Sequence, residues 1–397
     1  MGKYAFVFFL STDSSAGQFV HMLEVAKGLK ERDFIVALVV SNSCHSYASR
    51  LNLSRLKKLE DIFDEVIMNE PKHVCPLNKI PTKSIRRIVI STLPLILLLP
   101  KMKKLKNVIN KADRVVSILG MYYFTPRNLF KRFKDNYKIA MVYDLIPYEL
   151  KEYGLMSDDQ VRSFTRSLLK SLAPSHVVAT STEYTYQQLR EILKVKKPRV
   201  PLPPPVERPK GIKPLNRDDE YLTLSYLGSL EPKRLYPLLA MLKGLGQISG
   251  EKKLILMGCY KQSEIEKVMN TSKKANVEME VIRCPSDEYA FSIIASSDLF
   301  VFPTLSEGFG IPPMQALALN KPVVTSGIRP LTDIYGKCAV YADEPLNPSS
   351  WREAILKGLN FELNDECKNL VDKYSREYVI ENFLHSLSQH LNLRDLT

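Results

Sequence analysis

The sequence lacks the signatures of several common protein classes. It has no G-x-G-x-x-G fingerprint, and the turn after the first expected strand holds one glycine, Gly17, which argues against a dehydrogenase. Its six cysteines form no C-x-x-C pair, so free thiols in a reducing compartment are expected instead of a disulfide scaffold. The six histidines show no metal-ligand spacing, which disfavours a zinc site.

The most apolar stretch, Ile88–Leu99, is shorter than the ~20 residues that a membrane-spanning helix needs. Lysines and arginines flank it on both sides, so the segment 83–111 reads in two ways. A buried helix with solvated ends is favoured, and a segment lying on an anionic membrane is the alternative. A second basic cluster between 127 and 138 keeps that contact open. We therefore expect a cytoplasmic protein, with the membrane surface as its alternative location.

What the chain does have is size and positive charge. Its 397 residues are too many for one ordinary core, so two domains are expected, and the 45% hydrophobic and 25% charged residues are typical of globular proteins. The formal charge of +13 favours anionic partners. The basic clusters lack aromatic interleaving and any nucleic-acid motif, so nucleic acid is an unlikely partner.

Apolar runs alternate with helical periodicity along both halves. Tyr4–Leu10 and Phe34–Val40 read as strands around a helix, and a similar βα order restarts at Leu222. This order predicts an α/β protein with parallel sheets. The proline-dense stretch Lys197–Lys213 reads as a stiff connector. We expect two doubly wound Rossmann-like domains facing each other across a cleft. The expected domains are 1–205, 206–375, and a C-terminal helix in 376–397 that can cross back to the first.

The stretch Ser297–Ser326 carries the strongest local signal. It reads as a strand, a loop with Gly308 and Gly310, a helix stopped by a left-handed Asn320, and a second strand. In such a unit, glycine amides and the helix N-terminus form a site for an anion, typically a phosphate.

Three blocks in order resemble a known family. They are Tyr226–Arg234 (YLGSLEPKR), Ser286–Asp298 and Ser306–Gln315 (SEGFGIPPMQ). Together they resemble the C-terminal domain of retaining glycosyltransferases of the GT-B fold, in the large E-x7-E family (glycosyltransferase family 4-like, group 1). The likeness covers roughly residues 175–385, and the N-terminal half matches in the order of its elements and in the block Tyr143–Pro147.

The resemblance implies that 1–205 form the acceptor domain and 206–375 the donor domain, and it implies a role for each residue of the donor site. A basic pair at a helix start would hold the diphosphate of a nucleotide sugar, the first Glu of the E-x7-E motif would contact the donor sugar, and the second would bind the ribose. This chain has Gln315 at the second Glu and Tyr143 where many relatives carry His. The implied catalytic residues are Glu307, Lys233, Arg234 and Asp144. The implied substrate-binding residues are Gly17, Tyr143, Ser229, Gly308, Phe309, Gly310 and Gln315.

The resemblance also implies a reaction. The protein would transfer a sugar, with mannose slightly favoured, from GDP-mannose or a UDP-sugar to a glycan or lipid-linked acceptor. The family retains the anomeric configuration without a carboxylate nucleophile. No D-x-D motif is present, so metal independence and no cofactor are expected. The alternative is a non-catalytic GT-B protein that stabilises a partner glycosyltransferase. Tyr143 and Gln315, which depart from the family pattern, favour this alternative.

Overall fold

The computed structural model describes residues 4–11, 16–32, 34–41, 62–68, 112, 114–120, 137–216 and 220–391. The segment 83–111, expected to be a buried helix with membrane contact as the alternative, and most of the basic cluster at 127–138 lie outside the described residues. Among the described helices, none is both long and apolar enough to cross a membrane.

The described chain forms two compact units that do not follow the sequence in one block each. The first comprises Met1–Asp144, Asp159–Pro205 and Val379–Thr397, and the second comprises Leu145–Asp158 and Val206–Tyr378. The short segment 145–158, which the sequence places in the N-terminal domain, groups with the second unit.

The first unit is built on a parallel sheet in the strand order β3-β2-β1-β4-β5-β6-β7. The strands are β1 (Tyr4–Ser11), β2 (Ile35–Ser41), β3 (Glu65–Met68), β4 (Arg114–Gly120), β5 (Tyr137–Val142), β6 (Val177–Thr180) and β7 (Arg199–Pro201). The helices are α1 (Ala16–Lys30), α8 (Asp158–Leu172), α9 (Glu183–Leu193) and α17 (Arg376–Leu391). Apolar residues of α17 join this core, where the rings of Phe383 and Phe6 are 6.3 Å apart.

Strand β7 corrects one sequence expectation. It lies inside the proline-dense stretch that was expected to be a connector throughout, and it pairs with β6. Proline cannot donate a ladder hydrogen bond, so strands that contain it are confined to sheet edges. Strand β7 is the edge strand of its sheet, which reconciles Pro201 with a strand.

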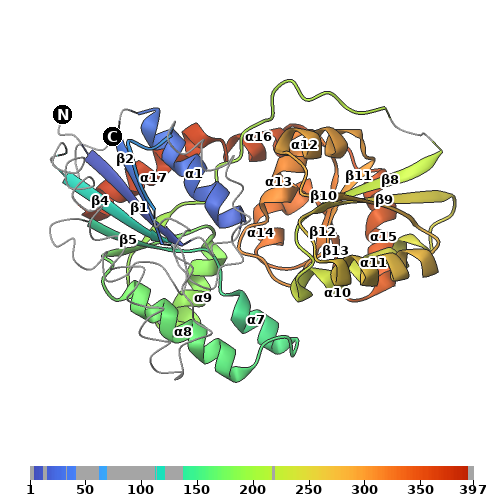
Figure 1. The fold of residues 1–397 in the computed structure, drawn as a ribbon, viewed down its shortest axis with the longest axis horizontal. Helices are drawn as coiled ribbons and strands as arrows, with labels where there is room; N and C mark the ends of the chain where they lie inside the picture. Colours follow the sequence, from blue (N-terminus) through green and yellow to red (C-terminus); the bar gives the residue numbers. More distant parts are fainter. Residues whose placement is uncertain are drawn as a thin grey trace. The chain divides into compact units, whose positions relative to one another are not determined.

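The second unit is built on a parallel sheet in the order β10-β9-β8-β11-β12-β13. The strands are β8 (Tyr221–Leu227), β9 (Glu251–Gly258), β10 (Glu278–Arg283), β11 (Leu299–Phe302), β12 (Val323–Ser326) and β13 (Val340–Ala342). The helices are α7 (Ile146–Glu152), α10 (Pro232–Leu245), α11 (Gln262–Lys274), α12 (Asp287–Ser296), α13 (Ile311–Ala318), α14 (Leu331–Tyr335), α15 (Pro348–Leu359) and α16 (Asp365–Asp372). Helices α10, α11 and α15 cover one face and α12 and α13 the other (Figure 1). The expectation of two doubly wound domains with parallel sheets is confirmed.

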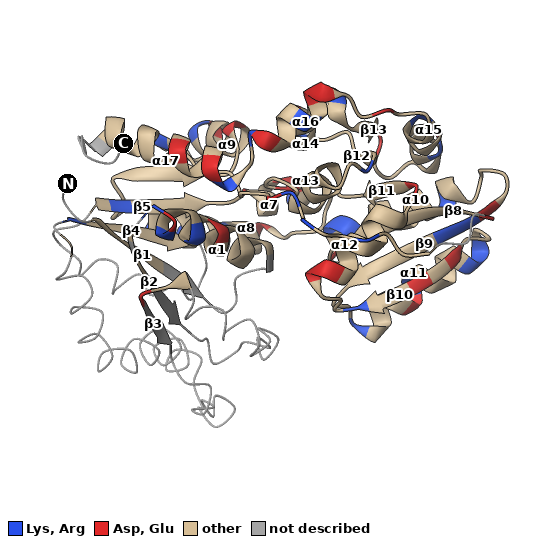
Figure 2. Ribbon diagram, turned by 90° about the horizontal axis from the view of Figure 1, so that it is seen from above, with Lys and Arg blue, Asp and Glu red and all other residues tan. Residues whose placement is uncertain are grey.

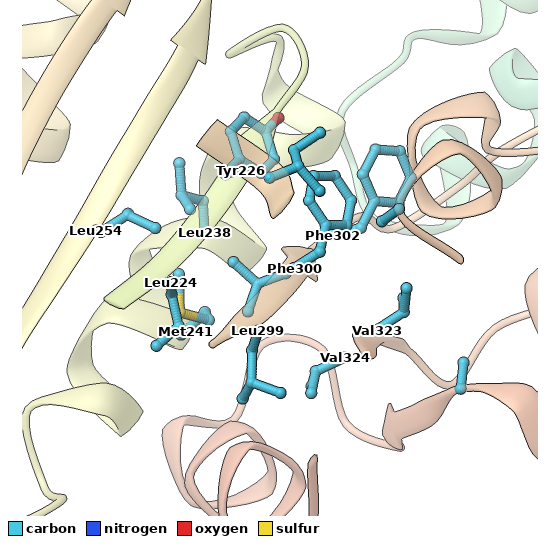
Figure 3. Packing of buried hydrophobic residues seen from close by; sticks show 14 of the residues in the cluster. Leu224, Tyr226, Leu238, Met241, Leu254, Leu299, Phe300, Phe302, Val323 and Val324 are labelled. Carbon is cyan, nitrogen blue, oxygen red and sulfur yellow. The ribbon is translucent and has the colours of Figure 1, made fainter. Parts of the chain in front are cut away.

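The central strands of the second sheet are apolar because both faces are covered by helices. Strands β8, β11 and β12 contain no Lys, Arg, Asp or Glu, and the charged residues of this unit are mainly on the surrounding helices (Figure 2). Figure 3 shows Leu224 and Tyr226 packed with Leu299, Phe300 and Phe302 on the adjacent strand. This packing fixes where β8 and β11 end.

The cysteines correct a second expectation. The structure pairs Cys259 with Cys284 and Cys338 with Cys367, with Cα–Cα distances of 4.7 and 5.3 Å. Both distances fall in the usual disulfide range. The expectation of free thiols is therefore wrong for these four cysteines, and Cys44 and Cys75 lie outside the described residues.

A test of the second core uses Gly244, where α10 meets α15. A Cβ at this position would lie 2.3 Å from the backbone oxygen of Pro348, and a helix backbone cannot give way cheaply. We expect Gly244→Ala to lower the free energy of unfolding by about 2 kcal/mol. The fluorescence of Trp351, the single tryptophan, reports denaturant unfolding of this unit. The exposed neighbour supplies the control: Lys243→Ala should shift stability by less than about 0.5 kcal/mol. Equal midpoints for the two variants would contradict the packing.

Candidate functional site

The candidate site lies where the strand order of the second sheet reverses. Strands β8 and β11 are neighbours in the sheet, but β8 leads outward to β9 and β11 leads outward to β12. At such a switch point the loops after the two strands part to opposite faces and leave a crevice at the carboxyl edge, which is the usual ligand site of doubly wound sheets. The two loops are 228–231, which runs into α10, and 303–310, which runs into α13.

The loop before α13 depends on Gly310. This residue has a φ of +84° and forms the N-cap of the helix without a side-chain cap. A Cβ there would lie 2.9 Å from Leu331 Cδ2, and the Tyr335 hydroxyl donates a 2.5 Å hydrogen bond to the Gly310 carbonyl. Pro312 and Pro313 carry no N–H, so this turn can offer an anion the amides of Ile311 and of the glycine loop before it, not a full row of helix amides.

Three charged side chains meet between the two loops. Oε1 of Glu307 accepts hydrogen bonds from Nε of Arg234 at 2.8 Å and lies 3.3 Å from Nζ of Lys233. The Glu307 and Lys233 residues are only 7% and 8% exposed. A backbone hydrogen bond from Leu305 to the Lys233 carbonyl, 2.8 Å long, ties the loops together. The structure thus brings together the three residues expected to act on the donor.

Aromatic packing holds Arg234 in place. Its guanidinium lies 4.9 Å from the centre of the Phe302 ring, at the end of β11. The approach needs a glycine on the neighbouring loop, because a Cβ at Gly228 would lie 2.9 Å from Arg234 Nη1. A cation that is stacked and ion-paired loses little further freedom on meeting a ligand.

The surroundings keep Glu307 ionised. Burial would raise the pKa of its carboxyl, but the charges of Arg234 and Lys233 and hydrogen bonds from Arg234 and Thr304 outweigh burial and hold the pKa below its ordinary value of 4.5. The Thr304 hydroxyl donates from 3.1 Å. The pKa of Arg234 is raised in turn: burial lowers it, and the Glu307 charge more than compensates.

The remaining expected residues of the second unit lie on the two loops and on α13. The Ser229 carbonyl accepts a 2.6 Å hydrogen bond from the Tyr226 hydroxyl. Gln315 lies half-buried on α13, and among the described residues its amide makes no hydrogen bond. The Phe309 ring packs edge-on against Tyr374, with 5.0 Å between ring centres, so its side chain belongs to the core. Gly308 is buried in the loop itself.

Gly17, Tyr143 and Asp144 belong to the first unit. Gly17 is exposed at the start of α1, and Asp144 is half-buried two residues after β5 ends. Tyr143 is buried, its hydroxyl meets no hydrogen-bond partner in the described part of the chain, and burial, reinforced by the Asp144 charge, raises its pKa. Tyr143 is thus unsuited to act as a base at neutral pH.

His21 lies against Tyr143, with ring centres 5.6 Å apart. Burial lowers the pKa of His21 to about 3, against hydrogen bonds to the backbone of Pro203 and Leu202 that raise it. The imidazole is therefore neutral at neutral pH and fills the core.

Sequence reasoning missed three residues that shape the site: Phe302, Thr304 and Glu149. Phe302 and Thr304 could have been suggested by their place at the end of β11. Glu149 had no such signal, because it lies 157 residues from the loop residue Ser306 whose hydroxyl donates a hydrogen bond to it. Within the described ranges, no group of three or more His, Cys, Asp or Glu side chains is placed to hold a metal ion.

Comparison with known proteins adds a family to this geometry. Residues 207–377 match the family of glycosyl transferases group 1. The chain is 34% identical over 82 residues to the O-antigen chain mannosyltransferase RfbU of Salmonella typhimurium, over 21% of this chain and 22% of that protein. It is 26% identical over 150 residues to the O-antigen chain mannosyltransferase B of Escherichia coli, over 34% of this chain and 39% of that protein. The matches thus span well under half the length of either curated relative.

Solved structures extend the likeness to the whole fold. HepE of Anabaena, solved in complex with UDP and glucose, superposes with a TM-score of 0.65 at 12% identity over 98% of this chain and all of that one. Sucrose-phosphate synthase from Thermosynechococcus elongatus gives 0.65 at 14% identity over 99% of both chains. At these identities the likeness concerns the fold, and it confirms the expected GT-B architecture.

The ion network predicts a pH-dependent stability. In Glu307→Gln the two buried cations lose their counter-charge, so we expect the free energy of unfolding to fall by about 3 kcal/mol at pH 7. A lowered folded pKa means that the wild-type advantage is complete above pH 4.5 and is lost as the pH falls through the folded value. The difference between variant and wild type should therefore be smaller at pH 3 than at pH 7 when unfolding is followed by tryptophan fluorescence.

The half-exposed Glu278, paired with Lys253 across neighbouring strands, provides the matched control. Glu278→Gln should change stability by no more than about 0.5 kcal/mol at either pH, because solvent screens its ion pair. An equal loss for Glu307→Gln at pH 7 and pH 3 would show that the pKa of this carboxyl is the same in the folded and the unfolded protein, which would contradict the ion network.

Proposed function

Because residues 207–377 match the glycosyl transferases group 1 family, we propose that this protein transfers a sugar from a nucleoside-diphosphate sugar to a glycan or lipid-linked acceptor, with retention and without a metal ion. The observation that carries the proposal is the buried trio of Glu307, Lys233 and Arg234 at the switch point of the second sheet. Two cations and the amides of the glycine loop suit a diphosphate, and a carboxylate beside them suits the sugar.

Each residue then has a role that its position supports. Lys233 and Arg234 open α10 and meet the diphosphate with both side-chain charge and helix dipole. The Gly308–Gly310 loop offers its amides to the same group. Glu307 contacts the donor sugar and supports positive charge at the reacting carbon. Gln315 hydrogen-bonds the ribose from α13, and Ser229 lines the opposite loop.

The reaction needs no protein base in this scheme. The acceptor oxygen forms a bond to the anomeric carbon as the bond from that carbon to the diphosphate breaks, and the acceptor proton passes to the departing diphosphate oxygen. The two cations outnumber the one carboxylate, so they stabilise the negative charge that develops on the leaving group. The raised pKa of Tyr143 supports a scheme in which that side chain takes no proton. Asp144 and Gly17 remain the candidates for acceptor contact in the first unit.

The donor we favour is GDP-mannose, because both curated relatives are named mannosyltransferases. A UDP-sugar is the alternative, since HepE was solved with UDP and glucose. The O-antigen names of the relatives support a surface-polysaccharide or lipid-linked acceptor.

A second candidate function rests on two substitutions in the family pattern. Tyr143 replaces a histidine with a buried phenol, and Gln315 replaces a carboxylate with an amide. A non-catalytic protein that binds and stabilises a partner glycosyltransferase would tolerate both.

Donor turnover separates the two candidates. Purified protein is incubated with GDP-mannose or UDP-sugars and lipid-linked glycans, and release of nucleoside diphosphate is followed with and without EDTA. We expect release that EDTA leaves unchanged, and a product with the anomeric configuration of the donor. Glu307→Ala should lower kcat by about 100-fold, because it removes the charge beside the reacting carbon. The exposed Glu266→Ala should match wild type. If wild type releases no nucleoside diphosphate, and Glu307→Ala releases as little as wild type, the partner-binding function would be favoured.

Gln315 offers a gain-of-function test. Restoring a carboxylate with Gln315→Glu should tighten binding of GDP or UDP by about threefold to tenfold, because a charged acceptor strengthens hydrogen bonds from the ribose hydroxyls. Isothermal titration calorimetry measures the change. The 2′-deoxy and 3′-deoxy nucleotides serve as controls and should gain less. The same gain with and without the hydroxyls would place Gln315 away from the ribose.

A further inference from the structure

Helix α7 supplies a side chain to the loop that carries Glu307. The helix follows β5 of the first unit in the chain, yet its segment 145–158 packs as part of the second unit. There the Ser306 hydroxyl donates a hydrogen bond to the Glu149 carboxylate. Ser306 is fully buried, so its hydroxyl depends on a protein acceptor.

Ser306 is placed to transmit that contact to Glu307. It is the residue directly before Glu307, and its carbonyl accepts a 3.1 Å hydrogen bond from the Thr304 hydroxyl. The same hydroxyl lies 3.1 Å from Oε1 of Glu307. One threonine hydroxyl thus contacts both the peptide that Glu149 anchors and the carboxylate that faces the cations. The Thr304 hydroxyl donates to the Ser306 carbonyl and to Oε1 of Glu307, so a shift of Ser306 and the adjoining Glu307 would move both acceptors.

The two cations belong to another element than the loop that Glu149 contacts. Lys233 and Arg234 stand on α10, and Arg234 is held by Phe302 as well as by Glu307. Loss of the Glu149 contact would therefore loosen the loop at Ser306 and Glu307, while α10 keeps its position and Gly310 stays held by the Tyr335 hydroxyl. This change would weaken the contacts to the sugar of a bound nucleotide sugar more than the contacts to its diphosphate.

We infer that Glu149 is a positioning residue for the sugar end of the donor: through Ser306 it fixes the loop from which Glu307 acts, and it leaves the diphosphate end to α10. This inference rests on the proposed glycosyltransferase function. A carboxylate suits the role because it accepts a stronger hydrogen bond than a neutral group from a buried hydroxyl.

The test compares a nucleotide with its sugar conjugate. Binding of GDP and GDP-mannose, and of UDP and UDP-glucose, is measured by calorimetry, together with kcat. In Glu149→Ala, the affinity for the free nucleotide should stay within about twofold of wild type. The extra affinity contributed by the sugar should be lost, and kcat should fall about tenfold or more. Glu149→Gln keeps an acceptor for Ser306 and should recover most of both.

Two further variants separate positioning from a general loss of structure. Glu152→Gln removes an exposed carboxylate from the same helix and should match wild type. Ser306→Ala should reproduce Glu149→Ala, and the double variant should be no worse than either single one, since both remove the same contact. Tryptophan fluorescence on unfolding checks that each variant is folded.

The outcomes are distinct. Equal weakening of nucleotide and nucleotide sugar, additive effects of the two substitutions, or wild-type behaviour of Glu149→Ala in an active enzyme would overturn the inference and leave the proposed function standing. A wild-type protein that binds no nucleotide sugar would overturn both.

Discussion

One buried carboxylate organises the candidate site. Glu307 is almost fully enclosed, and without Lys233 and Arg234 its charge would be costly to bury. The converse also holds, because both cations are buried or stacked and need the carboxylate. This mutual dependence joins the loop after β8 to the loop after β11, so the two sides of the crevice keep their spacing before any ligand arrives. An anionic ligand then meets cations that are already oriented.

The arrangement also explains why glycines cluster here. Gly228 lets Tyr226 and Arg234 approach the first loop, and Gly310 lets the second loop turn into α13 with a left-handed backbone. Neither position tolerates a side chain without displacing a neighbour. The glycine-rich character of the loops therefore has two causes, space in one and backbone conformation in the other.

Local pattern predicted much of this fold. The strands predicted at Tyr4–Leu10 and Phe34–Val40 lie within one residue of the observed bounds of β1 and β2, because each is an apolar run between polar segments. Asn320 has the expected left-handed φ of +57°. The contacts that the sequence did not predict join residues that are far apart in the chain. The paired cysteines are 25 and 29 residues apart, with no local spacing to mark them, and Glu149 meets a loop 157 residues away. Hydrophobic periodicity predicts which face of a helix or strand is buried, but it does not predict which other element packs against that face.

The interleaved path of the chain has a consequence for synthesis. Val379, Phe383 and Leu387 of α17 complete the core of the first unit, although they follow the whole second unit in the sequence. A growing chain therefore carries an unfinished first core until α17 has been made, while the second unit is complete by Tyr378. The second unit can thus finish folding before the first, although it is made later. A C-terminal truncation that removes α17 would destabilise the first unit.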